Sequence, residues 1–533
     1  MSSVTMSAPS AARLARPVIN PWVIAMTVTL ATFMEVLDSS IANVALPHIA
    51  GNLGATPDEA TWVLTSYLVS AAVVLPISGW LSDLLGRKRF YMICVLLFTV
   101  SSMLCGLSTS LPMLVFCRVL QGAGGGGLQP TEQAILADTF QPEQRSMGFA
   151  IYGMAILVAP TIGPTLGGWL TDTFSWHWIF FINLPIGVIS LFLTHRLIQD
   201  PPHVVKRGIE VRRGRVDAIG IAAIVLGVGF VQYALDKGQE LDWLASTPIR
   251  VALFAGIGLL AFMVWREWTI DDPIIKLQLL RKRNFACSVL FNFVLGIAMN
   301  GSFILIPQFL QMQMGYSAQL AGLALSPGGL AIALLMPVAG LVSTRFDPRK
   351  VIAFGFFITA ATMLMMTQIN AQIDFQTMMW LRVLQVVGIP FIFIPISTLA
   401  YVGVAPEENN QISGITNFVR NFGGAVGVSF LMTFLARHRA VSRVGMVSHL
   451  SNGNIFFQRY FAMLSHGGQD PASKHRALAQ LQMLVDGQAN TMSFISVFFV
   501  MGIVILCLVP LPFLMKRPTK KDMEATTMMH NAG

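Results

Sequence analysis

The sequence predicts an all-helical protein that crosses a membrane many times, and three observations support this fold class. The 533 residues are 54% hydrophobic and only 11% charged, whereas soluble domains carry about 25% charged residues. Apolar segments of about 20 residues, the length that spans a bilayer as a helix, recur along the chain. Basic residues gather in alternate connections between these segments. We therefore interpret the formal charge of +9 as a topology signal and not as a nucleic-acid-binding surface.

Fourteen segments are long and apolar enough to be membrane spans. In chain order, the expected spans are 22–45, 60–81, 90–110, 112–136, 147–171, 176–197, 216–236, 248–268, 285–310, 320–342, 351–369, 377–403, 412–437 and 494–515. An even number of spans places both termini on the same side of the membrane. On that side lie 24 of the 35 Lys and Arg residues, so both termini are expected to be cytoplasmic.

An internal repeat divides the chain into two halves. The motif RVLQG at Arg118–Gly122 recurs as RVLQVVG at Arg382–Gly388, and Gly79…Arg87-Lys88 has a weaker echo in Gly340…Arg349-Lys350. Two homologous helical bundles with a substrate site between them are typical of transporters. The expected divisions are a cytoplasmic N-terminal tail (1–21), an N-terminal six-helix bundle (22–200), a linker with two extra transmembrane helices (201–284), a C-terminal six-helix bundle (285–515) with an extracytoplasmic loop (438–490), and a cytoplasmic tail (516–533).

Two carboxyl groups lie inside the first expected span. Glu35 and Asp38 are three residues apart and therefore share one face of a helix. A charged carboxyl at the bilayer centre costs about 3 kcal/mol on insertion scales, so such residues are usually functional. We interpret them as a proton or ion relay that faces a water-filled cavity. The alternative is a fixed ion pair with an arginine on a neighbouring helix.

The fourth expected span carries one polar stripe. At about 100° per residue, Gln121, Gln129 and Glu132 fall on the same side of the helix as Arg118. Such a stripe faces the bundle interior or a cavity. Arg118 does not deprotonate, so it is suited to binding an anion or controlling the protonation of a carboxyl such as Asp38.

The fifth expected span contains APTIGPTLGG at Ala159–Gly168, whose glycines and prolines favour close helix packing. This packing serves either as a tight contact between the halves or as ordinary helix association. The sequence has no GxxxxGK[ST], HExxH or GxSxG motif, and its five cysteines lack metal-site spacing. We therefore expect neither an enzyme, a metal site nor a cofactor, and we expect an ion gradient to supply the energy.

Together these motifs resemble the major facilitator superfamily, specifically its fourteen-span drug:proton antiporter branch of the EmrB/QacA type. The motifs that carry the resemblance are LDSSIANVALP at Leu37–Pro47, GWLSDLLGRK at Gly79–Lys88, RVLQG at Arg118, GPTLGG at Gly163–Gly168, WHWIFFINLPIG at Trp176–Gly187 and NFVRNFGGAVG at Asn417–Gly427. They cover nearly the whole chain and are closest to EmrB-like proteins.

The residues and the resemblance together predict four groups of functional residues. They are proton-coupling residues (Asp38, with Glu35, Arg118 and Glu132 behind it), a cytoplasmic gate (Gly79, Asp83, Gly86, Arg87, Lys88 and Asp138), an antiporter motif (Gly163, Pro164, Gly167 and Gly168) and substrate-cavity candidates (Asn43, Gln129, Asn300 and Arg420). The resemblance implies the roles of Asp38, Arg118, the gate and the antiporter motif, whereas Glu35, Glu132 and the cavity candidates are predicted from polar residues inside spans.

The resemblance also implies a function. Such a protein lies in the cytoplasmic (inner) membrane, takes up protons, and exports hydrophobic or cationic drugs by alternating access. EmrB-like members work with a periplasmic adaptor and an outer-membrane channel, which favours a docking surface at 438–490 over a solvated loop. Two alternatives remain: a dedicated exporter of one metabolite, such as a lipid or siderophore, and a non-transporting sensor on the same fold.

Overall fold

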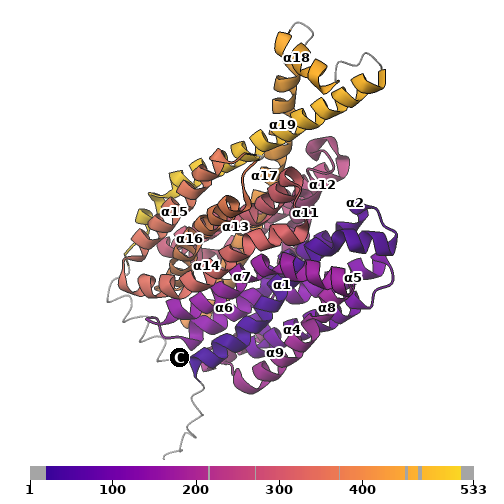
Figure 1. Cartoon of the computed structure of the whole chain (residues 1–533). Coiled ribbons are helices and arrows are strands. Elements are labelled where there is room, and N and C mark those ends of the chain that lie inside the picture. Colours follow the sequence, from indigo (N-terminus) through magenta and orange to yellow (C-terminus); the bar gives the residue numbers. More distant parts are fainter. Residues whose placement is uncertain are drawn as a thin grey trace, which may run out of the picture.

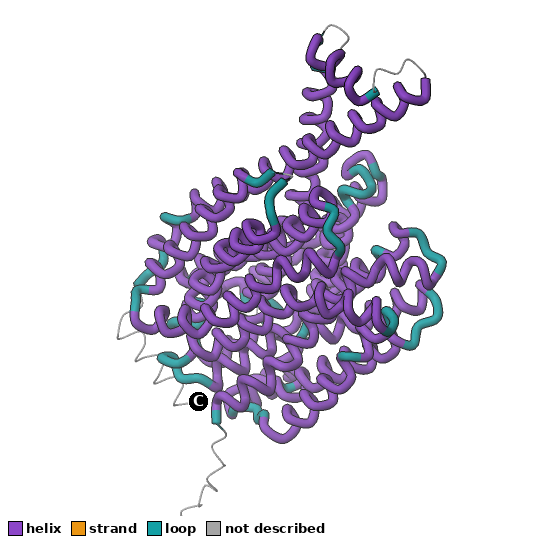
Figure 2. Tube along the Cα trace, in the orientation of Figure 1, coloured by secondary structure: helices purple, strands orange, loops and turns teal. Residues whose placement is uncertain are grey.

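The computed structural model describes residues 20–213, 216–270, 272–370, 372–450, 454–465 and 471–517. Within these ranges the chain is helical and contains no strand, as Figure 2 shows. The all-helical prediction is therefore confirmed for this part of the chain. The two expected tails, 1–21 and 516–533, lie almost entirely outside the described residues.

The N-terminal half consists of long helices joined by short connections. Its helices are α1 (Pro21–Leu53), α2 (Pro57–Ala60), α3 (Trp62–Leu85), α4 (Arg87–Gly106), α5 (Leu111–Gly125), α6 (Leu128–Thr139), α7 (Arg145–Thr173), α8 (Trp178–Phe181) and α9 (Asn183–Leu197).

The linker and the C-terminal half continue the same construction. Their helices are α10 (Pro202–Arg213), α11 (Ala218–Lys237), α12 (Thr247–Thr269), α13 (Arg283–Met314), α14 (Ala318–Arg345), α15 (Pro348–Met365), α16 (Phe375–Leu399), α17 (Asn409–Ser448), α18 (Ile455–Leu464) and α19 (Pro471–Leu508). Five short 3-10 helices are η1 (Trp243–Ala245), η2 (Leu277–Arg281), η3 (Met366–Gln368), η4 (Pro406–Glu408) and η5 (Leu511–Leu514).

Thirteen helical stretches of the described chain are long and apolar enough to cross a membrane, and each overlaps an expected span. The expected span 112–136 is not among them, because it is divided at Gly126 and Gly127 into α5 and α6, of 15 and 12 residues. The glycines there allow tight packing: a Cβ at Gly124 would lie 2.7 Å from the backbone nitrogen of Phe98 in α4. The count of fourteen spans stays a prediction.

The two halves lie side by side in Figure 1, and a few helix pairs join them. Helix α7 of the N-terminal half packs along α14, and α3 and α6 pack against α17. The linker helices α11 and α12 pack on each other, and α11 also contacts α3 and α17. The shared surface between the halves is therefore built from α3, α6 and α7 on one side and α14, α16 and α17 on the other.

Three helices extend beyond the body of the molecule. Helix α17 has 40 residues and is about 60 Å long at 1.5 Å per residue, roughly twice the hydrocarbon thickness of a bilayer. Its last turns, α18 and the start of α19 form a helical arm that projects from the bundle (Figure 1). The segment 438–490 is thus helical over most of its described residues. The sequence of α17 contains no proline that would end this helix earlier.

Candidate functional site

Asp38 lies in α1 and is almost completely buried, with 1% of its surface exposed. Its carboxylate accepts three hydrogen bonds: from Arg118 Nη1 at 2.6 Å, from Gln121 Nε2 at 3.0 Å and from Asn183 Nδ2 at 2.7 Å. The first is a buried ion pair between α1 and α5. The arginine that the sequence offered as a fixed partner is therefore Arg118, the first residue of the polar stripe.

Arg118 is held by more than its ion pair. Its Nε donates to the Val63 carbonyl oxygen at 3.0 Å, and its guanidinium lies 4.4 Å from the centre of the Tyr67 ring. An arginine over an aromatic face gains a further electrostatic attraction. These contacts with α3 position the cation toward Asp38.

Glu35 lies one turn before Asp38 and has neutral partners. Tyr67 Oη donates to one carboxylate oxygen at 2.9 Å, and Gln129 Nε2 donates to the other at 2.8 Å. Tyr67 therefore contacts both the Glu35 carboxylate and the Arg118 guanidinium, and links the two acids of α1.

Glu132 is fully buried in α6. Thr29 Oγ1 donates to its Oε1 at 2.6 Å, and within the described part of the chain its Oε2 has no hydrogen-bond partner. Every member of the predicted polar stripe thus bonds to a residue of α1: Arg118 and Gln121 to Asp38, Gln129 to Glu35, and Glu132 to Thr29.

A polar network crosses between the halves beside this site. Arg420 of α17 donates to Gln129 Oε1 at 3.1 Å, to Tyr152 Oη at 3.1 Å and to Asn417. Tyr152 in α7 donates to Asn417 Oδ1 at 2.8 Å, and Asn417 donates to Gln133 Oε1 at 2.5 Å. Gln129 therefore connects Arg420 of the C-terminal half to Glu35 of the N-terminal half.

Sequence reasoning placed Gln129 and Arg420 among the cavity candidates but did not single out Tyr67, Tyr152, Asn183 or Asn417. Their signal was present, since each is a polar side chain on a largely apolar segment. The two remaining cavity candidates lie apart from the network. Asn43 is exposed in α1, and Asn300 in α13 packs against Gly424, where a side chain would collide with it.

The predicted gate residues of α3 contact the first turn of α17. A Cβ at Gly79 would lie 2.7 Å from the Asn410 carbonyl oxygen, so the helices meet at backbone distance. Asn410 Nδ2 donates to Asp83 Oδ1 at 2.5 Å. Gly86 ends α3 with a φ of 90°, a conformation that favours glycine, and Asp200 lies beside it.

The cation Arg87 extends this contact to α6. Its Nε donates to Asn410 Oδ1 at 2.8 Å, and its Nη1 forms an ion pair with Asp138. Asp138 also accepts from Asn409 Nδ2 at 2.5 Å and lies 3.0 Å from His203 Nε2. Asn409 and Asn410, which the sequence analysis did not single out, therefore join the predicted gate to the other half.

Lys88 bonds within the N-terminal half. Its ammonium donates to the His195 carbonyl oxygen at 2.6 Å, and its backbone N–H donates to Asp200 at 2.8 Å. Of these two neighbouring cations, Arg87 therefore bonds to a residue of the other half, whereas the bonds of Lys88 stay within its own half. We call the surroundings of Gly79–Arg87 and Asn409–Asn410 the gate end.

The glycine motif of α7 packs mainly on α1. Gly163 lies directly against Ser40, and a Cβ at Gly167 would lie 3.0 Å from the Ile41 side chain. Gly168 faces open space, and Pro164 lies close to Gly322 of α14 in the other half. The motif therefore touches both halves, with its tightest contacts next to Asp38 in α1.

No group of three or more His, Cys, Asp or Glu side chains in the described ranges is arranged to hold a metal ion. The site's chemistry instead rests on buried carboxyl groups, two arginines and their amide and hydroxyl partners.

The sequence and fold match known transport proteins. The Major Facilitator Superfamily pattern matches residues 28–428. The multidrug export protein EmrB of Escherichia coli strain K12 is 34% identical over 506 residues, which cover 94% of this chain and 97% of EmrB. The fatty acid resistance protein FarB of Neisseria gonorrhoeae is 33% identical over 498 residues, which cover 93% of this chain and 96% of FarB.

A solved structure supports the fold independently of sequence. The proton:xylose symporter XylE superimposes with a TM-score of 0.59 at 13% identity, over 95% of this chain and 98% of XylE. The apolar helices and the long sequence match together identify a multi-pass protein of the cytoplasmic membrane. The chain belongs to the Major Facilitator Superfamily, and within it resembles the EmrB multidrug export proteins.

Proposed function

We propose that this protein is a drug efflux transporter that expels a hydrophobic or cationic compound in exchange for protons. The relatives at 34% identity support export of drugs in general. The observation that supports proton coupling is the buried Asp38–Arg118 ion pair inside α1 and α5. When a proton neutralises a buried carboxylate, the paired arginine is left with an unbalanced positive charge. Such a change in charge can shift the equilibrium between two conformations of the protein.

The proposed cycle begins with protonation of Asp38. The proton neutralises the carboxylate, so Arg118 loses its counter-charge while Tyr67 and the Val63 carbonyl still hold it. Glu35 senses the change through Tyr67, and its link through Gln129 to Arg420 reaches the other half. Protonation and the relative position of the halves are thereby coupled.

The gate end supplies the second half of the proposal. Asn409 and Asn410 bind Asp138, Asp83 and Arg87, so these contacts hold the halves together at one end. We propose that this end is cytoplasmic and that the contacts stabilise a state closed to the cytoplasm. Their rupture would open the route by which the drug enters.

Asp38→Asn tests the proton coupling. In inverted membrane vesicles with an imposed pH gradient, dye transport by the variant should fall to the level of vesicles without the protein. Its yield and its melting temperature in detergent should show a folded protein, because the amide retains the shape of the carboxyl.

The matched control is Asp58→Asn, which changes an exposed acid in α2 and should transport normally. Repeating the assay with and without sodium separates the two candidate ions. Normal proton-driven transport by Asp38→Asn would overturn the assignment, and transport that follows sodium alone would replace the proton by sodium.

We further propose that the helical arm docks a periplasmic adaptor that leads to an outer-membrane channel. Large apolar side chains are exposed there, among them Phe456 at 76%, Met483 at 73% and Val444 at 70%. Exposed apolar surface of this kind is typical of an interaction site.

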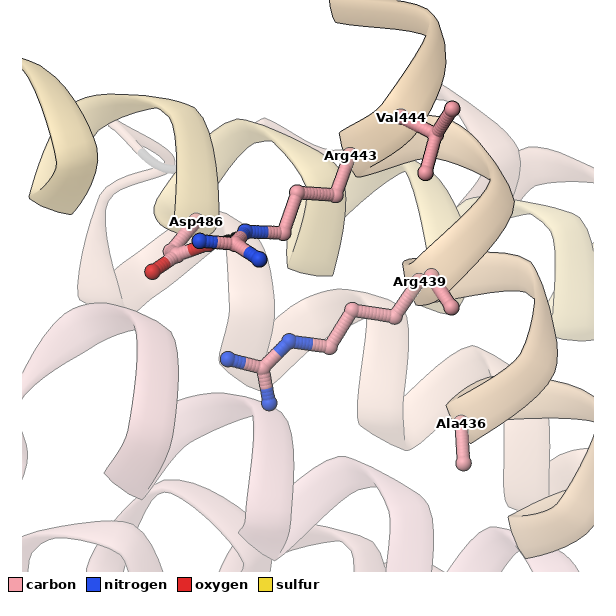
Figure 3. Close-up of a pocket in the computed structure, with 6 residues that line it drawn as sticks. Ala436, Arg439, Arg443, Val444 and Asp486 are labelled. Carbon is pink, nitrogen blue, oxygen red and sulfur yellow. Dashed lines mark hydrogen bonds and ion pairs between the residues drawn. The ribbon is translucent and has the colours of Figure 1, made fainter. Parts of the chain in front are cut away.

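At the base of the arm, α17 and α19 border an open hollow of about 440 Å³ (Figure 3). Arg443 closes one side through its bond of 2.7 Å to Asp486, while Arg439 points into the same space. Phe456→Asp should reduce co-purification with the adaptor, whereas Arg459→Gln, which changes a polar residue of the same helix, should not. Equal recovery with both variants would contradict this docking surface.

A further inference from the structure

The C-terminal half contains a structural counterpart of the Asp38 site. The spacing of 264 residues that relates Arg118 to Arg382 also relates Gln121 to Gln385, and it relates Asp38 to Ser302. In the structure, Arg382 Nη1 donates to Ser302 Oγ and to Gln385 Oε1, each at 2.6 Å. Gln385 Nε2 approaches Ser302 Oγ at 2.6 Å. The arrangement of α1 and α5 is thus repeated in α13 and α16, with a hydroxyl in place of the carboxylate.

The substitution leaves Arg382 without a counter-charge. Arg382 is 1% exposed, and the partners that its Nη1 has in the described chain are the neutral oxygen atoms of Ser302 and Gln385. Its Nε is buried and has no hydrogen-bond partner in the described chain. Arginine stays protonated in proteins, and a buried charge is strongly unfavourable unless it is paired.

The neighbours of Arg382 compensate this charge only in part. The guanidinium lies 4.9 Å from the centre of the Phe303 ring, which is an attractive but weak contact. Ser302 and Gln385 offer neutral oxygen atoms. On the Nε side lies Gly328 of α14, where a Cβ would be 3.5 Å from the Arg382 Nε.

We propose that Arg382 binds a small monovalent anion, which supplies the charge that Asp38 supplies in the other half. Chloride matches this chemistry, and so does the carboxylate group of an acidic compound. Arg382 lies seven residues after Phe375, the first residue of α16, so it is about 10 Å from the helix end.

The experiment measures thermal unfolding of the full-length protein in detergent. Buffers of equal ionic strength contain either chloride or isethionate, a monovalent anion too large for an enclosed site. The wild-type protein should melt several degrees higher in chloride, with a saturable dependence on its concentration. A third buffer series adds formate, a small carboxylate, to isethionate, which tests whether a carboxylate replaces chloride.

Two variants locate the effect at Arg382. Ser302→Asp places a carboxylate beside the guanidinium and should remove the chloride dependence, and Arg382→Gln should remove it by eliminating the cation. The matched control is Ser302→Asn. The asparagine side chain has the shape of aspartate but no charge, so the melting temperature of this variant should still respond to chloride.

The outcomes separate clearly. Stabilisation by chloride that Ser302→Asp abolishes supports a chloride site, and stabilisation by formate alone supports a carboxylate group as the occupant. Equal melting of the wild-type protein in all three series would overturn the proposal. A chloride response that persists in both Ser302→Asp and Arg382→Gln would place the ion elsewhere and would also overturn it.

Discussion

The two buried arginines of the repeat, Arg118 and Arg382, differ mainly in the charge of their partners. Both lie at equivalent positions in their halves, and both bond to a glutamine one turn later. Arg118 faces the carboxylate of Asp38, whereas Arg382 faces the hydroxyl of Ser302. The duplicated halves have thus kept the hydrogen-bond geometry but not the ionisable acid, so only one of these two sites contains a group that a proton can neutralise.

The gate shows a similar divergence. The weaker echo of the gate, Gly340…Arg349-Lys350, also contains an acid, Asp347. Asp83 accepts a bond from Asn410 in the other half, while Asp347 caps the start of α15 and binds Arg349 two residues later. The N-terminal copy therefore connects the halves, and the C-terminal copy stabilises its own helix end.

The largest expected effect is a difference in stability between variants of the two arginines. Arg118→Gln leaves the Asp38 carboxylate buried without its cation, which should cost about 3–5 kcal/mol. Arg382→Gln in chloride-free buffer removes a charge that has no protein counter-ion, so it should be neutral or stabilising. Thermal or denaturant unfolding in detergent measures both. If the two variants lost equal stability, the different charges of Asp38 and Ser302 would not affect the stability of the folded protein.

The second prediction concerns the contact between the halves. Asn410→Ala removes bonds to Asp83 and Arg87, and hydrogen bonds to charged groups contribute about 1.5–3 kcal/mol each. The population with a separated gate end should rise at least tenfold, measured by spin-label distances across that end. Asn421→Ala is the control, because the side chain of Asn421 donates to the Asn417 carbonyl of its own helix, within the part of the chain that the structure describes. An unchanged distance distribution would show that Asn410 does not hold the gate.

The third prediction concerns Glu132, the last residue of the polar stripe. Glu132→Gln replaces a buried carboxyl group, which could take a negative charge beside a bound cation, by a neutral amide, and it should weaken export of cationic compounds several-fold. Export of neutral compounds should change little. Vesicle transport of one cationic and one neutral dye measures the ratio, and equal losses would argue for a purely structural role.

The smallest effect concerns Asp347 at the C-terminal counterpart of the gate. Hydrogen bonds from Arg349 lower the pKa of Asp347 from its usual value. A carboxyl with a lowered pKa stabilises the folded state while it is ionised, above about pH 4, and this contribution is lost as the pH falls through the folded-state pKa. The difference in melting temperature between the wild-type protein and Asp347→Asn should therefore shrink on acidification. A constant difference from neutral pH to about pH 3 would contradict this assignment.

Much of the candidate site followed from sequence because helices impose a known periodicity. The stripe of Arg118, Gln121, Gln129 and Glu132 required only the helical repeat, and all four side chains do share one partner helix. The identity of that helix, and the addition of Asn183 from α9 to the Asp38 site, depended on how the helices pack. Contacts between residues far apart in the chain have no local periodicity that would reveal them.

The sequence alone determined that the chain is helical and duplicated, because these properties follow from composition, apolar segments and a repeated motif. Only the tertiary structure decided that Asn409 and Asn410 bind the gate, that Arg420 reaches Glu35 through Gln129, and that α17 continues into an arm. It also revealed that Arg382 lacks a counter-charge. A charge is readable in a sequence, but whether it is buried and paired depends on every helix packed around it.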